Sequence, residues 1–341
     1  MTPARARPEG FKPIRDGIAL AASIVAPLAL FVLTLPRTVV LEDDGLFLMA
    51  GAHLGVAHPP GYPLYTLIVH LFTLLPFGSV AFLGHLSSAV LGALACGCVY
   101  ICARLIGASS ISALTASLLF AASEHFWSQA IVTEVYTLNA LFFFGKYALL
   151  LYGVRHPHRT GIWIGAAAAC GLSLANHVPL TVLSMPGLAL LAFTVRRHLY
   201  RKLPLLLVIL ACSAVLPYAW MVWRSHQDVL INFYGSIDTL KEFWFYFSRQ
   251  GYIEVDISPS AGWHDRFRFM QWLGNEFLWQ LTLPGFALAV LGLVILFRRR
   301  PAAIPWSGAL VFLTNSIVRS FRMSLDVYPH PENTSSDALD Q

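Results

Sequence analysis

The stretch LEDDGLFLMAGAHLGVAHPPGYPLY, residues 41–65, joins a cluster of acids to a long segment without charge. Glu42, Asp43 and Asp44 follow an uncharged run at 17–36, and residues 45–103 contain no Asp, Glu, Lys or Arg. An apolar run of about 20 residues is long enough to cross the roughly 30 Å of hydrocarbon in a bilayer. We therefore interpret the acids as a polar link after the first of several membrane-spanning helices.

The composition places the whole chain in the membrane class. Of its 341 residues, 57% are hydrophobic and only 12% are charged, with a mean hydropathy of +0.63. Soluble proteins carry about 25% charged residues. The net charge of +5 resides in short basic clusters between apolar runs, which is typical of cytoplasmic loops and argues against a nucleic-acid partner. The five cysteines all lie in apolar segments and predict no disulfide framework.

The apolar runs predict an all-α polytopic membrane protein with about nine transmembrane helices. The run at 160–195 is too long for one helix, and Asn176, His177 and Pro179 supply a break within it. The run at 135–152 includes Lys146. The nine expected spans are 17–36, 80–103, 107–123, 135–152, 160–176, 177–195, 203–223, 277–297 and 301–318.

The short segment 62–75, YPLYTLIVHLFTLL, is expected to lie along the membrane surface. With this placement, 14 of the 23 basic residues fall on one side of the membrane, and 16 of the 18 acids fall on the other. The N-terminus is then cytoplasmic, and the Ala-rich, cysteine-poor composition favours a bacterial inner membrane. The expected divisions are a cytoplasmic segment 1–16, a membrane core 17–223 with a first loop 37–79, an aromatic-rich loop 224–276 with interfacial helices, two helices within 277–318, and a polar tail 319–341.

Three acids at the extracytoplasmic edge are the candidate catalytic residues. Asp43 and Asp44 follow the first span, and Glu134 begins another span on the same side. A carboxylate at a membrane interface suits a general base or a ligand of a divalent cation, and a solvated loop is the alternative. We expect Asp43 to be the base and Glu134 to support it. No metal-ligand set is assigned, and a divalent cation remains open.

The turn HPPGYP at 58–63 is expected to return the chain rigidly to the membrane. Pro59 and Pro60 fix φ, Gly61 permits positive φ, and Pro63 suits the first turn of a helix. A purely architectural role is the alternative to a place in the reaction centre. The candidate substrate-binding residues of this turn and of the neighbouring span ends are His58, Tyr62, Tyr136, Asn139 and His177.

The loop 224–276 combines many aromatic residues with arginines. Arginines on the extracytoplasmic side depart from the usual charge asymmetry and indicate an anionic partner such as a phosphate. Arg224 and Arg249 are the first choices for this contact. The aromatic residues predict either an interfacial anchor or a lid over sugar rings or a lipid tail.

Several motifs resemble one multi-pass membrane family with a GT-C-like fold. They are DDG at 43–45, LGVAHPPGYPLY at 54–65, LLPFGSVAF at 74–82, FWSQAIVTEVYTLNAL at 126–141 and GLSLANH at 171–177. The family, long described as a domain of unknown function, includes the endoplasmic-reticulum protein O-mannosyltransferase that acts on receptor Ig-like domains. The family pattern after the first span is D-S-G-E, so Asp43 takes the place of the Asp, Asp44 that of the Ser and Leu46 that of the Glu.

The resemblance implies a glycosyltransferase that takes a sugar from a polyprenyl-phosphate donor. The acceptor would be a protein or glycan hydroxyl on the extracytoplasmic face, and membrane lipid would surround the protein. A lipid-linked donor agrees with the absence of nucleotide-binding and zinc-protease motifs. The alternative is a non-catalytic carrier or assembly subunit for lipid-linked sugars.

Overall fold

The computed structural model describes residues 13–40, 43–252 and 262–318, and these residues confirm the all-α class. In the described part of the chain, the one non-helical pairing is a β-bridge between Val56 and Asn232. Glu42, residues 1–12 of the predicted cytoplasmic segment 1–16, residues 253–261 of the predicted loop 224–276 and the predicted tail 319–341 lie outside the described residues.

The helices follow one another with short connections. The first group comprises α1 (Pro13–Thr34), α2 (Asp44–His53), α3 (Pro63–Thr73), α4 (Val80–Ile106), α5 (Ser110–Ala122), α6 (Glu124–Ala130), α7 (Tyr136–Arg155) and α8 (Thr160–Leu174). The second comprises α9 (Val178–Thr194), α10 (Arg196–Leu199), α11 (Leu203–Ser225), α12 (Leu240–Phe247), the 3₁₀ turn η1 (Gln250–Tyr252), α14 (Trp263–Arg299), α15 (Ala303–Leu313) and the π-helical η2 (Thr314–Val318).

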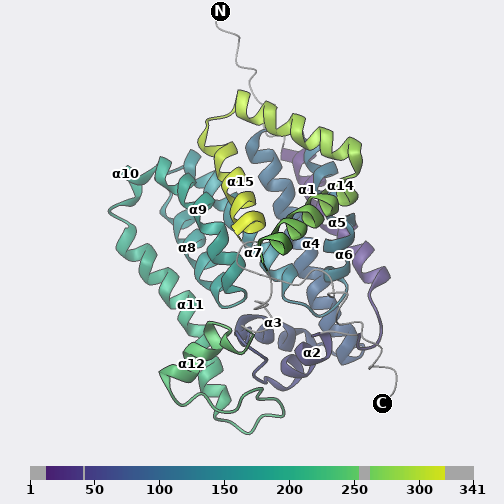
Figure 1. Cartoon of the computed structure of the whole chain (residues 1–341), viewed down its shortest axis with the longest axis vertical. Helices are drawn as coiled ribbons and strands as arrows, with labels where there is room; N and C mark the ends of the chain where they lie inside the picture. The colour runs from purple at the N-terminus through teal and green to yellow at the C-terminus, as the bar shows by residue number, and fades with distance from the viewer. Residues whose placement is uncertain (1–12, 41–42, 253–261, 319–341) are drawn as a thin grey trace, which may run out of the picture.

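The two ends of the helix bundle differ in what they hold. Helices α2, α3 and α12 lie together at one end, whereas α10 and the start of α1 lie at the other (Figure 1). Basic residues hold the latter end together, because Arg104 pairs with Asp16 at 2.9 Å and Lys202 Nζ donates to the Pro157 carbonyl at 3.3 Å. The position of α3 outside the long helices agrees with the surface placement expected for 62–75.

Five of the described helices are long and apolar enough to span a membrane. They are α4, α7, α11, α14 and α1 from Ile14. The other expected spans include α5, α8 and α9, which have 13, 15 and 17 residues. The membrane class is therefore confirmed, and the count of nine crossings stays a prediction.

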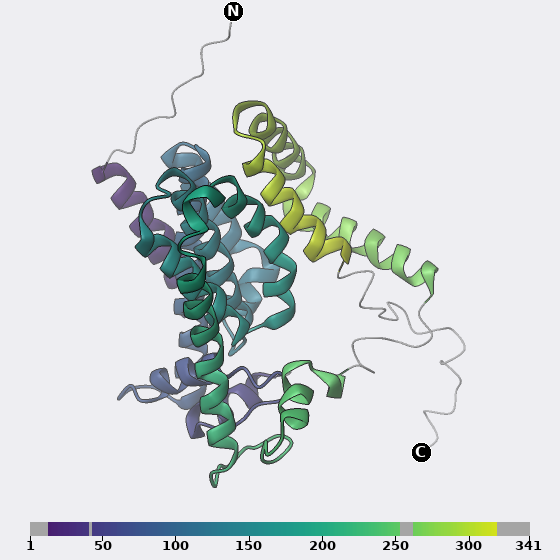
Figure 2. The same cartoon turned by 90° about the vertical axis from the view of Figure 1, so that its left-hand side faces the viewer.

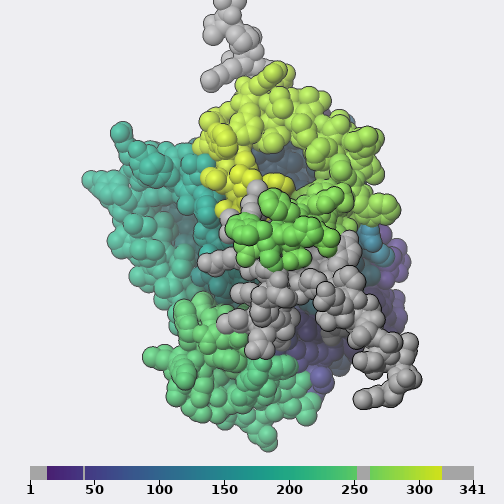
Figure 3. Space-filling model, in the orientation of Figure 1, coloured from purple at the N-terminus to yellow at the C-terminus, as the bar shows by residue number. Residues whose placement is uncertain are grey.

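The C-terminal helices depart from the expected boundaries. Helix α14 begins at Trp263, inside the predicted loop 224–276, and its backbone breaks at Thr282, where φ is 57° and ψ is 165°. Pro284 explains the break, because a proline lacks the amide that the helix needs and crowds the backbone that precedes it. Figure 2 shows α14 and α15 at one side of the molecule. In the space-filling view they frame a hollow, with earlier helices at its floor (Figure 3).

Small residues let the core helices approach closely. A Cβ added to Gly171 in α8 would lie 2.2 Å from the Leu210 carbonyl oxygen in α11, so only glycine fits this crossing. A polar contact joins α7 to α15, because the hydroxyl of Tyr147 in α7 lies 2.8 Å from Oγ of Ser307 in α15. These contacts fix the long helices whose ends carry the candidate residues.

Candidate active site

The neighbouring acids at the start of α2 occupy different environments. Asp43 is the residue just before the first helical position, and its side chain is 52% exposed. Asp44 is the first residue of α2, and its side chain is 1% exposed. Because successive residues at a helix start point in different directions, the two carboxyl groups do not share one environment.

Asp44 is held by three donors from three parts of the chain. Its Oδ1 lies 2.9 Å from both His85 Nε2 in α4 and the Thr133 amide, and its Oδ2 accepts from the Val40 amide at 2.9 Å. Burial is the strongest single influence and raises the pKa of Asp44, but the combined hydrogen bonds outweigh it and lower the pKa. Asp44 therefore anchors the first loop to α4 and to the segment before α7.

Asp43 makes a similar contact but stays accessible. Its Oδ2 lies 2.9 Å from His58 Nε2, and His58 Nδ1 lies 3.0 Å from the Pro59 carbonyl oxygen. The hydrogen bond from His58 lowers the pKa of Asp43, and the positive charge of Arg249 acts in the same direction against the effect of burial. Asp43 is thus an ionised carboxylate that faces solvent at the edge of the helices.

The turn at 58–63 has the geometry that its residue types predict. The Gly61 amide donates to the His58 carbonyl at 2.7 Å, and Gly61 has a φ of +88°. A Cβ at this position would lie 2.2 Å from Sδ of Met221 in α11. Pro63 is the first residue of α3, as predicted. The turn therefore needs glycine for both its backbone conformation and its packing.

Tyr62 links this turn to the opposite wall of the site. Its ring packs edge-on against His58, with centroids 5.4 Å apart, and its hydroxyl accepts from Arg249 Nη1 at 3.1 Å. On the other side, the ring centroid of His177 lies 6.5 Å from that of Tyr62 and 6.1 Å from that of Tyr136. Burial raises the pKa of Tyr62, so its hydroxyl keeps its proton.

Glu134 approaches the same group of side chains from the start of α7. Its side chain is buried, and its backbone amide donates to Ser88 Oγ at 3.3 Å. The charge of Glu134 contributes to raising the pKa values of both Tyr62 and Tyr65, which agrees with a carboxylate close to the turn. The expected position of this acid at the head of a span is therefore observed.

The two arginines expected to bind phosphate have different surroundings. Arg224 Nε donates to the Leu54 carbonyl at 2.7 Å, and Nη2 donates to that of His53 at 3.1 Å, so this guanidinium caps the C-terminal end of α2. Arg249 follows α12 and reaches Tyr62. Of the two, Arg249 lies with the candidate site and Arg224 supports the scaffold.

The contacts therefore bring together seven of the residues expected from the sequence. They are Asp43, His58, Tyr62, Glu134, Tyr136, His177 and Arg249. Asn139 lies one turn after Tyr136 on α7, and its role in binding stays a prediction. In the described ranges there is no group of three or more His, Cys, Asp or Glu side chains suited to a metal ion.

Two parts of this arrangement were not predicted from the sequence. His85 is a fully buried member of the Asp44 cluster, and the signal for it was an ionisable side chain inside an apolar run, which requires a polar partner. The segment 226–239 covers the turn, because Val56 pairs with Asn232 and the Phe233 ring lies 5.9 Å from that of His58. Nothing in the spacing of these residues indicated the pairing.

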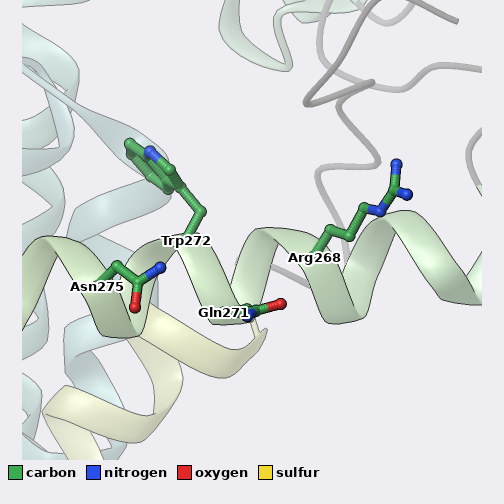
Figure 4. A pocket seen from close by; sticks show the side chains of 4 residues that line it. All are labelled: Arg268, Gln271, Trp272 and Asn275. Atoms are coloured by element: carbon green, nitrogen blue, oxygen red, sulfur yellow. The ribbon is translucent and has the colours of Figure 1, made fainter.

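A separate surface depression lies on the first half of α14. Arg268, Gln271, Trp272 and Asn275 line it, and all four come from this one helix (Figure 4). Their spacing of three and four residues places them on one helix face. The lining contains no carboxylate, so this depression offers no base for chemistry.

Comparisons with known proteins connect this site to one family. Residues 43–201 match the family model of the protein O-mannosyl-transferase TMEM260 N-terminal domain. The protein O-mannosyl-transferase TMEM260 of Mus musculus is 30% identical over 92% of this chain and 45% of its own length. The protein of the same name from Dictyostelium discoideum is 25% identical over 74% of this chain and 33% of its own length. No solved structure matches.

The chain spans less than half the length of these curated relatives. Both relatives are eukaryotic, so the comparisons do not support the bacterial membrane that the composition favoured. The matched range includes Asp43, the turn at 58–63, Glu134 and His177, which are among the residues that the contacts bring together, whereas Arg249 lies outside it. Residues 43–201 are therefore similar to the protein O-mannosyl-transferase TMEM260 N-terminal domain, and these residues hold most of the candidate site.

Proposed function

We propose that this protein is a membrane glycosyltransferase that moves mannose from a polyprenyl-phosphate donor to a hydroxyl group of a protein. The names of its relatives support the sugar and the class of acceptor. The observation that carries the chemistry is Asp43, an ionised and half-exposed carboxylate at the end of the helices where α2 and α3 lie. The proposed face is extracytoplasmic, opposite to the basic end of the bundle.

In the proposed reaction, the acceptor oxygen attacks the anomeric carbon of the sugar. The bond between this carbon and the phosphate oxygen breaks, and polyprenyl phosphate leaves with the bonding electrons. Asp43 accepts the proton of the attacking hydroxyl, which is the role of a general base. Arg249 is the cation that stabilises the departing phosphate, since its charge reaches both Asp43 and Tyr62.

The remaining side chains bind and orient the reactants. Tyr136 is 42% exposed and lies against His177, so its ring is placed to contact a substrate from the opposite wall. Glu134 is buried, and its charge acts on Tyr62, so in this proposal it supports the site without access to solvent. In this proposal, the exposed apolar side chains of α14, among them Leu288 and Leu291, face the membrane lipid in which the polyprenyl chain of the donor lies.

A carrier or assembly subunit for lipid-linked sugars is the other candidate. A carrier is expected to have acids along the middle of its spans. Here Asp43 and Glu134 lie outside helices, at the starts of α2 and α7. The position of the acids favours surface chemistry over transport.

The test is sugar transfer by the purified full chain in nanodiscs, with polyprenyl-phosphate mannose and a peptide that contains Ser and Thr. Asp43→Asn keeps the shape of the side chain and removes the base, so turnover should fall at least ~100-fold. Asp228→Asn changes an exposed acid in the loop after α11 and serves as the control with normal turnover. Near-normal transfer by Asp43→Asn would rule out the assigned base. Absence of transfer by the wild type would rule out the function.

A further inference from the structure

Among the described residues, two hydrogen-bond acceptors and three aromatic rings lie against the ring of His58. Nδ1 lies 3.0 Å from the Pro59 carbonyl oxygen, and Nε2 lies 2.9 Å from Asp43 Oδ2. The ring centroids of Phe47, Tyr62 and Phe233 lie 5.7, 5.4 and 5.9 Å from that of His58. The side chain is 4% exposed, so this orientation is set by packing and not by solvent.

Both ring nitrogens of His58 face groups that only accept hydrogen bonds. A backbone carbonyl has no proton to donate, and an ionised carboxylate has none either. Each nitrogen must then carry its own proton, which gives the ring a positive charge. The contact with Asp43 is consequently a charge-assisted hydrogen bond.

This bond distinguishes the two oxygens of Asp43. Oδ2 is committed to His58, and Oδ1 makes no hydrogen bond among the described residues. A carboxylate held through one oxygen is oriented, and its second oxygen is available to a substrate. Orientation of this kind lowers the barrier of a reaction, because the base does not have to be arranged after the substrate binds.

The Asp44–His85 pair provides an internal comparison. His85 also lies between a carbonyl oxygen, that of Pro36 at 2.9 Å, and a carboxylate, that of Asp44 at 2.9 Å. In that pair both side chains are buried, and Asp44 accepts two further backbone hydrogen bonds. The same carboxylate–histidine pair therefore occurs twice. Both oxygens of Asp44 accept hydrogen bonds, whereas only Oδ2 of Asp43 does so among the described residues.

We propose that His58 is a positioning residue, whose fixed and charged ring orients Asp43 and keeps it ionised so that Oδ1 takes the proton of the acceptor hydroxyl. This inference deepens the proposed function and rests on it. It assigns no contact between His58 and the substrate, since three aromatic rings and the carboxylate surround the imidazole.

Other charged and titratable groups lie near the His58–Asp43 pair, and they also contribute to its pH dependence. The segment 226–239 presents Phe233, an apolar ring. The groups on the remaining elements are Tyr62 at the start of α3, Glu134 and Tyr136 at the start of α7, His177 at the start of α9 and Arg249 after α12. None of them lies between His58 Nε2 and Asp43 Oδ2, which are in direct contact.

The decisive measurement is the pH profile of kcat/KM for His58→Gln and His58→Ala. Gln keeps an N–H donor near Asp43 without the charge, and Ala removes both. The acid limb of the profile should move to higher pH in both variants, because Asp43 without the positive ring is protonated more readily. Turnover at neutral pH should fall about tenfold in Gln and up to about 100-fold in Ala, as expected for a misplaced base.

His85→Gln is the matched control, since it changes the same kind of unit on Asp44. It should lower the thermal stability and leave the acid limb where it is in the wild type. An unmoved acid limb in both His58 variants would overturn the proposal, and so would an equal shift in His85→Gln.

A second readout separates this inference from the proposed function. The thermal unfolding midpoint of the full chain in nanodiscs, followed from pH 7 to pH 3, reports the ionisation of Asp43 without any substrate. Acid destabilisation should be less steep in His58→Gln than in the wild type, because the folded-state pKa of Asp43 then lies closer to its unfolded value, and this difference should vanish in the Asp43→Asn background. Absence of transferase activity in the wild type would contradict the proposed function. If His58→Gln still changes the acid destabilisation in the Asp43→Asn background, His58 does not act through Asp43.

Discussion

His85 Nε2 lies 2.9 Å from Asp44 Oδ1, in a pair of which neither side chain is more than 1% exposed. The pair joins α4 to the start of α2, and Asp44 also accepts the amide of Thr133. Since Asp43 immediately precedes Asp44, this buried pair sets the position of the neighbouring accessible carboxylate. Asp44 thus holds the local structure, and the adjacent Asp43 is the proposed base.

Asp44→Asn should destabilise the protein strongly. An Asn side chain has the same shape, but its NH₂ group would face donors from His85, Thr133 or Val40 in place of an acceptor. Loss of one partner from a buried ion pair costs about 3–5 kcal/mol. The free energy of unfolding in a mild detergent measures this loss.

Asp43→Asn is the matched comparison for Asp44→Asn, because its carboxylate is half exposed. It should cost less stability while removing activity. Equal destabilisation by the two substitutions would contradict the assignment of Asp44 to the scaffold.

The sequence predicted the parts of this site that depend on local chemistry. The positive φ of Gly61, the start of α3 at Pro63 and the break between α8 and α9 at 175–177 all follow from residue types with restricted or permissive backbones. The placement of Glu134 at the start of α7 follows from the beginning of an apolar run. These features need no knowledge of distant partners.

The different roles of Asp43 and Asp44 depend on tertiary contacts and could not be predicted from the sequence. Asp44 meets His85 across 41 positions and Thr133 across 89. Arg224 reaches the end of α2 across 170 positions. The charge asymmetry of the sequence predicted that this arginine binds a phosphate, whereas in the structure it caps a helix. The start of α14 was missed because its first half mixes charged and polar residues with aromatic ones, so no apolar run marks the helix there.

Stability should fall at acidic pH in a way that Asp44 partly controls. The pKa of Asp44 in the folded state is lower than its ordinary value of 3.8. The unfolded chain therefore binds the proton first as the pH falls, and the stabilisation by this carboxylate is present above about pH 4 and is lost as the pH drops through the lower folded-state value. Unfolding midpoints from pH 6 to pH 3 should decline less steeply in Asp44→Asn. Parallel curves for the variant and the wild type would contradict a lowered pKa.

Arg249 and Arg224 should affect the proposed reaction differently. Arg249→Gln keeps a donor for Tyr62 and removes the charge beside Asp43, so we expect donor binding to weaken by about 1.5–3 kcal/mol, as for a charged hydrogen bond. Arg224→Gln removes the cap of α2 and should lower the unfolding midpoint with little effect on the KM for the donor. Titration of each variant with polyprenyl-phosphate mannose decides the matter, and a weaker donor affinity in Arg224→Gln alone would exchange the two roles.

Gly61→Ala should disrupt the turn more than the same substitution at another positive-φ glycine. Gly235 has a φ of +83° with nothing within 4 Å of an added Cβ, so Gly235→Ala measures the backbone cost alone, about 1–2 kcal/mol. At Gly61 the added methyl also meets Met221, which should cost about 1–3 kcal/mol more. Adding Met221→Ala should recover part of that difference, and no recovery would show that the contact with α11 is not the cause.

The charge asymmetry of the bundle makes the orientation of the chain testable. Arg104 pairs with Asp16, and Arg155 donates to the Leu105 carbonyl, so the basic ends of α4 and α7 lie with the start of α1. Because basic loops stay in the cytoplasm, reporter fusions after Arg197 and after Arg300 should both read cytoplasmic. A fusion near Ser236, in the segment that covers the turn at 58–63, should read extracytoplasmic, and this places Asp43 on the face where the lipid-linked donor is proposed to react. A cytoplasmic reading at Ser236 would put the acids and the basic loops on one side and would exclude that orientation.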